Sequence, residues 1–276
     1  MTSSTWSAKA NPIGRSVLSR LNLIALIALV AVGLGACAQQ SARTASRSDS
    51  RPHPGVAAAH RLPVHGIDVS KWQGKIDWAS VSASGTQFAF IKATEGGDHV
   101  DERFLENWAG AKAAGVARSA YHFMFWCRPA EEQAAWFKRV VPADPGAMPP
   151  VLDLEWNGQS RKCPWKIDRS QALAMIKVML HEMEAHTGKR PIIYTDITFH
   201  KDVLDGELSQ YPHWLRSTAA EPYVRYNDRR WTMWQYTTTG RVPGILGAVD
   251  RNAFYGTEGE WLAFLKNDCD PRFCRG

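Results

Sequence analysis

The chain has 276 residues, 45% of them hydrophobic, and a formal net charge of +6. The excess of positive charge lies at the N-terminal end, because residues 62–276 hold 26 basic and 26 acidic residues. A nucleic-acid-binding domain needs a basic patch on its folded part. The balanced charge of residues 62–276 therefore argues against nucleic acid as a partner.

Residues 1–36 have the pattern of a secretory signal peptide. Three basic residues and no acidic one precede the apolar run LNLIALIALVAVGLGA, which is shorter than the about 20 residues that span a bilayer. The end of this run, Leu34-Gly35-Ala36-Cys37, resembles the lipobox of bacterial lipoproteins, in which the signal is cut before the cysteine and the cysteine is lipidated. We therefore expect a lipid anchor at Cys37, with a plain signal peptide and an incidental cysteine as the alternative.

The segment that follows Cys37 favours a tether over a folded element. Residues 37–61 are rich in Ser, Ala, Arg and Pro and show no apolar period, so we expect them to be disordered. Ala38 stands where an aspartate favours retention in the inner membrane. The resemblance to lipoproteins therefore points to the cell envelope, with the protein held on the outer membrane and facing the periplasm.

Four cysteines remain for the folded domain, which we place at residues 62–276. In an oxidising compartment an even number favours disulfides, and four cysteines allow three pairings. Cys269 and Cys274 are close enough to close a small loop, which leaves Cys127 and Cys163 as the favoured second pair. No Cys-x-x-Cys metal site is present.

Short strand-like runs recur through the domain, with helical patterns between the first five. The predicted strands are residues 65–70, 88–96, 118–125, 149–156, 191–197, 213–218, 231–238 and 248–252. The predicted helices are residues 101–115, 130–141, 168–188 and 260–266. Alternating strands and helices indicate a parallel sheet with helical crossovers.

Eight strands with few helices late in the chain predict an irregular TIM-like β/α barrel. An α/β fold of the doubly wound, open type is the alternative, but the Gly-rich turn that binds nucleotides after its first strand is missing here. In a barrel, functional side chains lie at the C-terminal ends of the strands. We place eight residues there, four of them acids: Asp68, Asp153, Glu155 and Asp250, with Tyr121, Tyr194, Trp234 and Gln235.

The segment PPVLDLEW, residues 149–156, carries two of these acids. Side chains alternate along a strand, so Asp153 and Glu155 share one face. Crowding and partial burial raise the pKa of one carboxyl group of such a pair. We expect Glu155 to hold its proton in mildly acidic solution while Asp153 stays ionised, as acid catalysis requires.

Six motifs in order resemble glycoside hydrolase family 25, the N-acetylmuramidase lysozymes, over about residues 64–265. They are HGIDVSKWQGKIDW, FAFIKATEG, SAYHF, PPVLDLEW, PIIYTD and WQYTTTGRVPGILGAVDRN. The resemblance implies an irregular β/α barrel that cleaves the β-1,4 bond between N-acetylmuramic acid and N-acetylglucosamine in peptidoglycan. It further implies that Glu155 is the general acid and Asp153 its partner, with Asp68 and Asp250 on the same floor.

The sequence departs from the family pattern in two loops, which carry Cys127 and Cys163 and would flank the cleft. We expect a monomer that needs neither a metal nor another cofactor, with peptidoglycan strands as substrate and the membrane as its anchor. A non-catalytic peptidoglycan-binding lipoprotein is the alternative. The intact acid set argues against it, because a binder has no need for a costly carboxylate pair.

Overall fold

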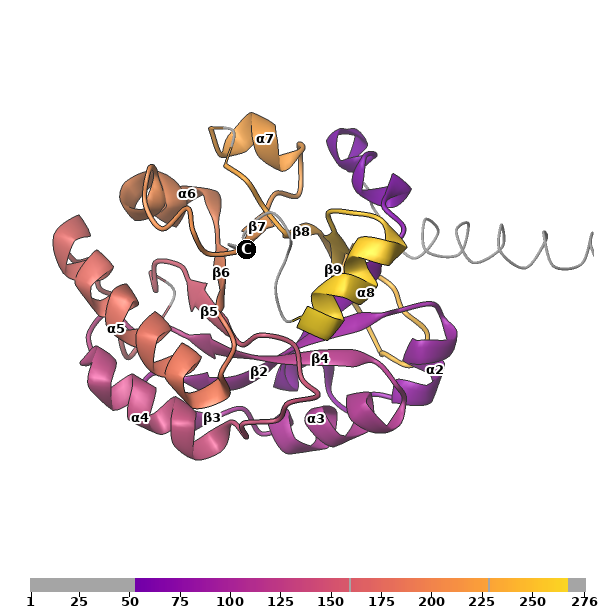
Figure 1. Cartoon of the computed structure of the whole chain (residues 1–276), viewed down its shortest axis with the longest axis horizontal. Coiled ribbons are helices and arrows are strands. Elements are labelled where there is room, and N and C mark those ends of the chain that lie inside the picture. The colour runs from indigo at the N-terminus through magenta and orange to yellow at the C-terminus, as the bar shows by residue number, and fades with distance from the viewer. Residues whose placement is uncertain (1–52, 159, 228, 268–276) are drawn as a thin grey trace, which may run out of the picture. The chain divides into compact units, whose positions relative to one another are not determined.

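The computed structural model describes residues 53–158, 160–227 and 229–267, and these form a closed barrel of eight strands (Figure 1). A ninth strand, β3, pairs only with β2 as a hairpin beside the ring. The strands are β1 His65–Val69, β2 Phe88–Glu95, β3 His99–Val100, β4 Ala117–Phe123, β5 Val151–Leu154, β6 Ile192–Thr195, β7 His213–Arg216, β8 Met233–Gly240 and β9 Val249–Phe254. All eight predicted strands are present, and the predicted TIM-like barrel is confirmed.

Strand direction changes at one point of the ring. Neighbours from β1 through β2, β4, β5, β6 and β7 to β8 are parallel, whereas β9 is antiparallel to both β8 and β1. We call the end of the barrel where the parallel strands finish the mouth. β9 therefore begins at the mouth and ends at the opposite end.

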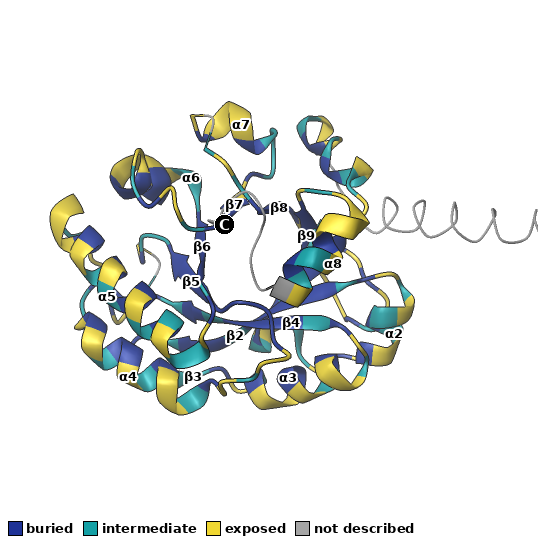
Figure 2. Ribbon diagram, in the orientation of Figure 1, coloured by how far each residue is buried: buried dark blue, intermediate teal, exposed yellow. Residues whose placement is uncertain are grey.

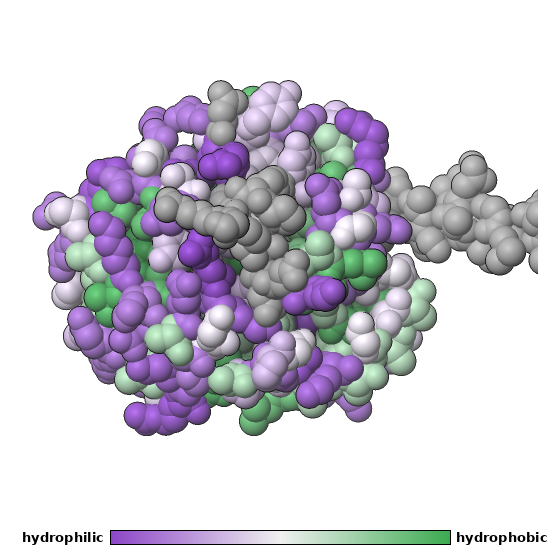
Figure 3. Space-filling model, in the orientation of Figure 1, coloured by the Kyte–Doolittle hydropathy of each residue, from purple (hydrophilic) through white to green (hydrophobic). Residues whose placement is uncertain are grey.

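Helices cover the outside of the first strands and become short later in the chain, as the sequence predicts. They are α2 Trp78–Ala83, α3 Phe104–Ala113, α4 Ala130–Val140, α5 Arg169–Thr187, α6 Ile197–Phe199, α7 Pro222–Arg225 and α8 Glu258–Asn267. The inner faces of α2 to α6 pack with the outward-facing strand residues in one hydrophobic cluster. Figure 2 shows the strands mostly buried and the outer helical faces exposed, and most of the surface around them is hydrophilic in Figure 3. No helix among the described residues is both long and apolar enough to cross a bilayer.

The barrel interior changes in character from one end to the other. A second apolar cluster fills the end opposite the mouth, with Phe88, Met233 and Phe254 from the strands and Trp261 and Phe264 from α8. Since the parallel strands enter the barrel at this end, α8 closes the bottom of the barrel. The acids described below lie at the other end, the mouth.

The predicted tether is partly wrong, because the end of it belongs to the fold. Residues 54–56 and 59–61 form two 3₁₀ turns. Val56 and Ala59 are fully buried against Trp234, Tyr236 and Ala253 on the outer face of β8 and β9. The apolar side chains of a short PGVAAA stretch therefore have a partner that composition alone did not reveal. Residues 37–52, with Cys37, lie outside the described residues.

Candidate active site

Two carboxylates face each other at the seam between the first and last strands. Asp68 and Asp250 are register partners in the antiparallel pair of β1 and β9. The Gln235 Nε2 atom donates to Asp68 Oδ2 at 2.9 Å and lies 3.2 Å from Asp250 Oδ2. The Asn252 Nδ2 atom donates to Asp68 Oδ2 at 2.8 Å. Amide groups thus connect the two acids from neighbouring strands.

Two aromatic side chains fix the orientation of these amides. The Tyr194 hydroxyl donates to Gln235 Oε1 at 2.9 Å, and Trp214 Nε1 donates to Asn252 Oδ1 at 2.7 Å. With each amide oxygen accepting from an aromatic donor, each NH₂ group points toward the carboxylates. Buried polar networks of this kind are stable because their members are hydrogen-bonded.

Burial disfavours the ionised form of both acids at the seam. It raises the pKa of Asp68, while the hydrogen bonds from Asn252 and Gln235 act in the opposite direction. The pKa of Asp250 is raised to about 8, first by burial and then by the neighbouring charge of Asp68. Asp68 therefore carries the negative charge of the pair, and Asp250 holds a proton.

The second pair, Asp153 and Glu155, comes from the end of β5. Asp153 is 7% exposed, and its Oδ1 atom has no hydrogen-bond partner among the described residues. Burial and then the charge of Glu155 raise the pKa of Asp153 well above its usual range. The pKa of half-buried Glu155 is also raised, by burial and then by Asp196, with Arg216 opposing. The prediction for Glu155 agrees with this direction. The expectation that Asp153 stays ionised does not, because Asp153 is the more deeply buried of the two.

The two predicted tyrosines face the interior, but the predicted tryptophan does not. Tyr121 and Tyr194 pack with the inner cluster, and burial raises the pKa of both phenols well above the usual value, so they remain donors. Trp234 is 1% exposed and lies on the outer face of β8, where its Nε1 atom donates to the carbonyl of Ser217 at 2.7 Å. Its assignment as a substrate-binding residue is wrong, because adjacent strand residues face opposite sides and Gln235 faces inward.

The loop that carries Glu155 is held to the loop after β4. Trp126 Nε1 donates to the Glu155 carbonyl at 2.7 Å, and Trp126 N donates to Asn157 Oδ1 at 3.3 Å. Asn157 Nδ2 in turn donates to the Met124 carbonyl at 3.0 Å.

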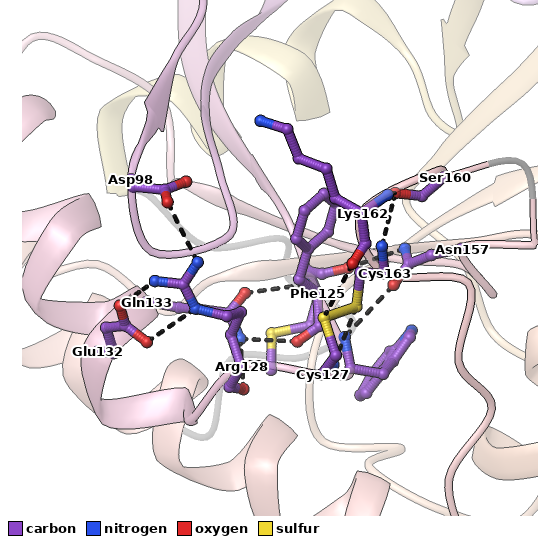
Figure 4. Close-up of a disulfide and its surroundings, with 12 residues drawn as sticks. Asp98, Phe125, Cys127, Arg128, Glu132, Gln133, Asn157, Ser160, Lys162 and Cys163 are labelled. Atoms are coloured by element: carbon purple, nitrogen blue, oxygen red, sulfur yellow. Dashed lines mark hydrogen bonds and ion pairs between the residues drawn. A yellow bond between two sulfur atoms is a disulfide. The ribbon is translucent and has the colours of Figure 1, made fainter.

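A predicted disulfide fastens the same two loops further out. Cys127 and Cys163 are bonded, with Cα atoms 5.6 Å apart, which confirms this pair (Figure 4). Cys269 and Cys274 lie outside the described residues. The acid-bearing loop is thus fixed by both a covalent bond and buried hydrogen bonds.

Comparison with known proteins identifies the family. The model of the glycosyl hydrolases family 25 matches residues 67–245. Lysozyme M1 from Streptomyces globisporus is 36% identical over 228 residues, which are 77% of this chain and 74% of that protein. The chain belongs to glycosyl hydrolase family 25. This membership confirms the predicted enzyme class, a glycoside hydrolase of the muramidase type.

Solved structures of the same family share the fold. The bacterial lysozyme from Streptomyces coelicolor has a TM-score of 0.69 and 35% identity, over 76% of this chain and 100% of that one. A family 25 glycosyl hydrolase from Bacillus anthracis has the same TM-score and 33% identity, over 78% of this chain and 97% of that one. The irregular barrel is thus the barrel of family 25.

Three further charged groups at the mouth were not predicted from the sequence. Asp196 follows β6 directly and Arg216 is the last residue of β7, so their places after predicted strands were the available signal. Lys92 lies on β2 beside the acids and forms a 2.6 Å ion pair with Glu95. Among the described residues, no group of three or more His, Cys, Asp or Glu side chains is placed to hold a metal ion.

Proposed function

We propose that this family 25 enzyme hydrolyses the β-1,4 bond between N-acetylmuramic acid and N-acetylglucosamine in peptidoglycan, with Glu155 as the general acid. The observation that carries the proposal is the Glu155 carboxyl group, half-buried at the end of β5 and with its pKa raised. A protonated carboxyl group near neutral pH is what a poor leaving group requires.

Asp68, which carries the negative charge of the seam pair, suits the positive charge that develops at the anomeric carbon. When Glu155 gives its proton to the glycosidic oxygen, the bond from that oxygen to C1 breaks. A water oxygen then bonds to C1, and the proton that the water loses passes to a carboxylate of the site, so one water is consumed for each bond cleaved. Asp153 Oδ1 is buried and has no partner among the described residues, although buried polar atoms are normally hydrogen-bonded. We propose that Asp153 Oδ1 accepts a hydrogen bond from the N–H of the substrate's 2-acetamido group. This bond would orient the 2-acetamido group beside C1.

The substitution Glu155→Gln tests the general acid, because it keeps the shape of the side chain and removes the transferable proton. Muropeptide release from purified peptidoglycan should fall by at least about 100-fold. Glu131→Gln, at an exposed position of α4, is the matched control and should retain wild-type rates. A near-normal rate for Glu155→Gln beside an active wild type would exclude Glu155 as the acid. Binding without release by the wild type would favour the non-catalytic alternative.

We also propose that the protein is a lipoprotein of the cell envelope, anchored through Cys37. The support is the signal-like residues 1–36 with their lipobox-like end. Acyl chains contribute about 0.8 kcal/mol per buried methylene, and more than one chain gives stable attachment. Cells supplied with labelled palmitate should therefore incorporate the label into the wild type but not into Cys37→Ala. A wild type that takes up no label would refute the anchor.

A further inference from the structure

Arg216 occupies a place at the mouth beside the acids. It lies two residues after Trp214 on β7, so both side chains are on the same face of the strand. Trp214 packs inside the barrel, with its ring centroid 4.1 Å from that of Phe90 and 4.4 Å from that of Tyr194. Arg216 is also the register partner of Gln235, which contacts the Asp68 and Asp250 carboxylates. The guanidinium group therefore extends from the interior face at the level of the acids.

This guanidinium group is exposed and makes no hydrogen bond or ion pair with any residue in the described part of the chain. Its backbone is nevertheless held in place, because the Tyr226 hydroxyl donates to the Arg216 carbonyl at 2.5 Å. Lys92, another cation of the interior face, is neutralised by Glu95. Arg216 thus offers at the mouth a cation whose donors are free of every other described residue.

A role in balancing the charge of the acids does not explain this arrangement fully. Burial acts to lower the pKa of the Arg216 guanidinium group, but the acidic groups around it, Glu155 and Asp196 among them, raise it. An arginine that served only to neutralise one of them would gain most by a direct, bidentate contact. Arg216 instead bonds to none of the acids among residues 53–158, 160–227 and 229–267, while remaining within their electrostatic reach.

The substrate of the proposed reaction carries a group that needs such a cation. N-acetylmuramic acid differs from N-acetylglucosamine by a 3-O-lactyl arm, which ends in a carboxylate in peptide-free strands and otherwise carries a peptide with its own carboxylates. The ionised carboxyl group of Asp68 at the mouth repels another carboxylate. A planar guanidinium fork matches the two oxygens of a carboxylate better than an ammonium group does.

We propose that Arg216 binds a carboxylate on the lactyl arm of N-acetylmuramic acid or on the peptide attached to it, and so selects muramyl over uncharged glycans. This inference rests on the proposed muramidase function. Arg216 is then a specificity-determining residue, separate from the proton transfer at Glu155.

The test compares charged substrates with their neutral derivatives. Peptide-free tetrasaccharides of alternating N-acetylglucosamine and N-acetylmuramic acid are used with free carboxylates and as methylamides, and peptide-bearing fragments are prepared in the same two forms. The kcat and KM of the wild type, Arg216→Met and Arg216→Lys are measured on all four. Arg139→Met, at an exposed arginine of the outer helix α4, is the matched control. In parallel, Kd values are measured in the Glu155→Gln background with and without Arg216→Met, after thermal melting has shown that each variant is folded.

We expect the wild type to favour the charged form by about 10-fold in KM, since hydrogen bonds between ionised groups are roughly twice as strong as neutral ones. Arg216→Met should lose this preference with kcat little changed, Arg216→Lys should keep part of it, and Arg139→Met should keep all of it. The substrate pair that shows the preference, peptide-free or peptide-bearing, identifies the source of the carboxylate.

Three results would overturn the inference. The first would be a wild type that does not distinguish charged from neutral substrates. The second would be an Arg216→Met variant that keeps the wild-type preference for the charged form. The third would be an Arg216→Met variant that cleaves both forms more slowly, by the same factor, and has a shifted pH profile. The last result would mean that Arg216 acts on the carboxyl groups of the enzyme. If the wild type cleaves none of the substrates, the proposed function fails, whereas the Kd values still decide whether Arg216 recognises the carboxylate.

Discussion

The Asp68–Asp250 pair should make the folded protein less stable as the pH rises from about 4 to about 8. Asp250 has a pKa of about 8 in the folded state, against 3.8 for the free side chain. Between these values the native state keeps a proton that the unfolded chain releases. The unfolded state then binds fewer protons, so the free energy of unfolding falls with rising pH. The stabilising contribution is complete below about pH 4 and is lost by about pH 8.

The size of the effect follows from the pKa difference. One unit corresponds to about 1.4 kcal/mol, so a single group moved from 3.8 to about 8 accounts for at most about 6 kcal/mol. Asp250 shares its proton with Asp68 and is only half-buried, which makes a total of about 2–3 kcal/mol a more realistic expectation. That change is large compared with the 5–15 kcal/mol typical of a whole domain.

Urea unfolding at pH 5, 6, 7 and 8 measures this slope. Asp250→Asn removes the titrating group and keeps its shape, so the variant should gain stability relative to the wild type as the pH rises. Asp98→Asn is the control, since Asp98 is an exposed residue in a 3.1 Å ion pair with Arg128. Parallel curves for the wild type and Asp250→Asn would refute the assignment of the shared proton to this pair.

Two further predictions concern the parts that hold the barrel together. Replacing Cys127 and Cys163 with serine removes a disulfide between residues 36 apart in the sequence. In the chain-entropy model this should lower the free energy of unfolding by about 4 kcal/mol. Urea unfolding measures the change, and an unchanged midpoint would contradict the prediction. Val56→Asp places a charge in the fully buried contact of the first 3₁₀ turn and should lower the free energy of unfolding by at least about 2 kcal/mol. Ala57→Asp, at the exposed neighbouring position, should change the free energy of unfolding by less than about 0.5 kcal/mol. Equal melting temperatures of these two variants would mean that the turn is not part of the folded unit.

The strands could be predicted because the barrel imposes a local pattern on the sequence. A strand such as β5 is buried along its whole length, so it appears as a short apolar run bounded by turn residues. The acids stand out because they interrupt such runs at their ends. Glu155 and Asp153 could therefore be placed at the site from sequence alone, and Asp68 likewise.

Tertiary contacts account for what the sequence did not reveal. The 3₁₀ turns at residues 54–61 have no periodic pattern and fold because Trp234 and Tyr236 offer an apolar surface. The state of Asp153 depends on how deeply its carboxyl group is enclosed, which side-chain alternation does not determine. Arg216 is an ordinary strand-end residue by pattern, and only the absence of a partner among the described residues distinguishes it.

The direction of β9 explains how the second acid reaches the mouth. In a fully parallel barrel only the last residues of each strand lie there. Asp250 is the second residue of β9, and Phe254 ends the strand in the apolar cluster at the other end. The sequence-based placement of Asp250 at a strand's C-terminal end was therefore wrong, although its place in the site was right. Because β9 is antiparallel to β1, Asp250 lies in direct register with Asp68. That register brings the two carboxyl groups close enough to share a proton, so the reversal of one strand gives the site its coupled acid pair.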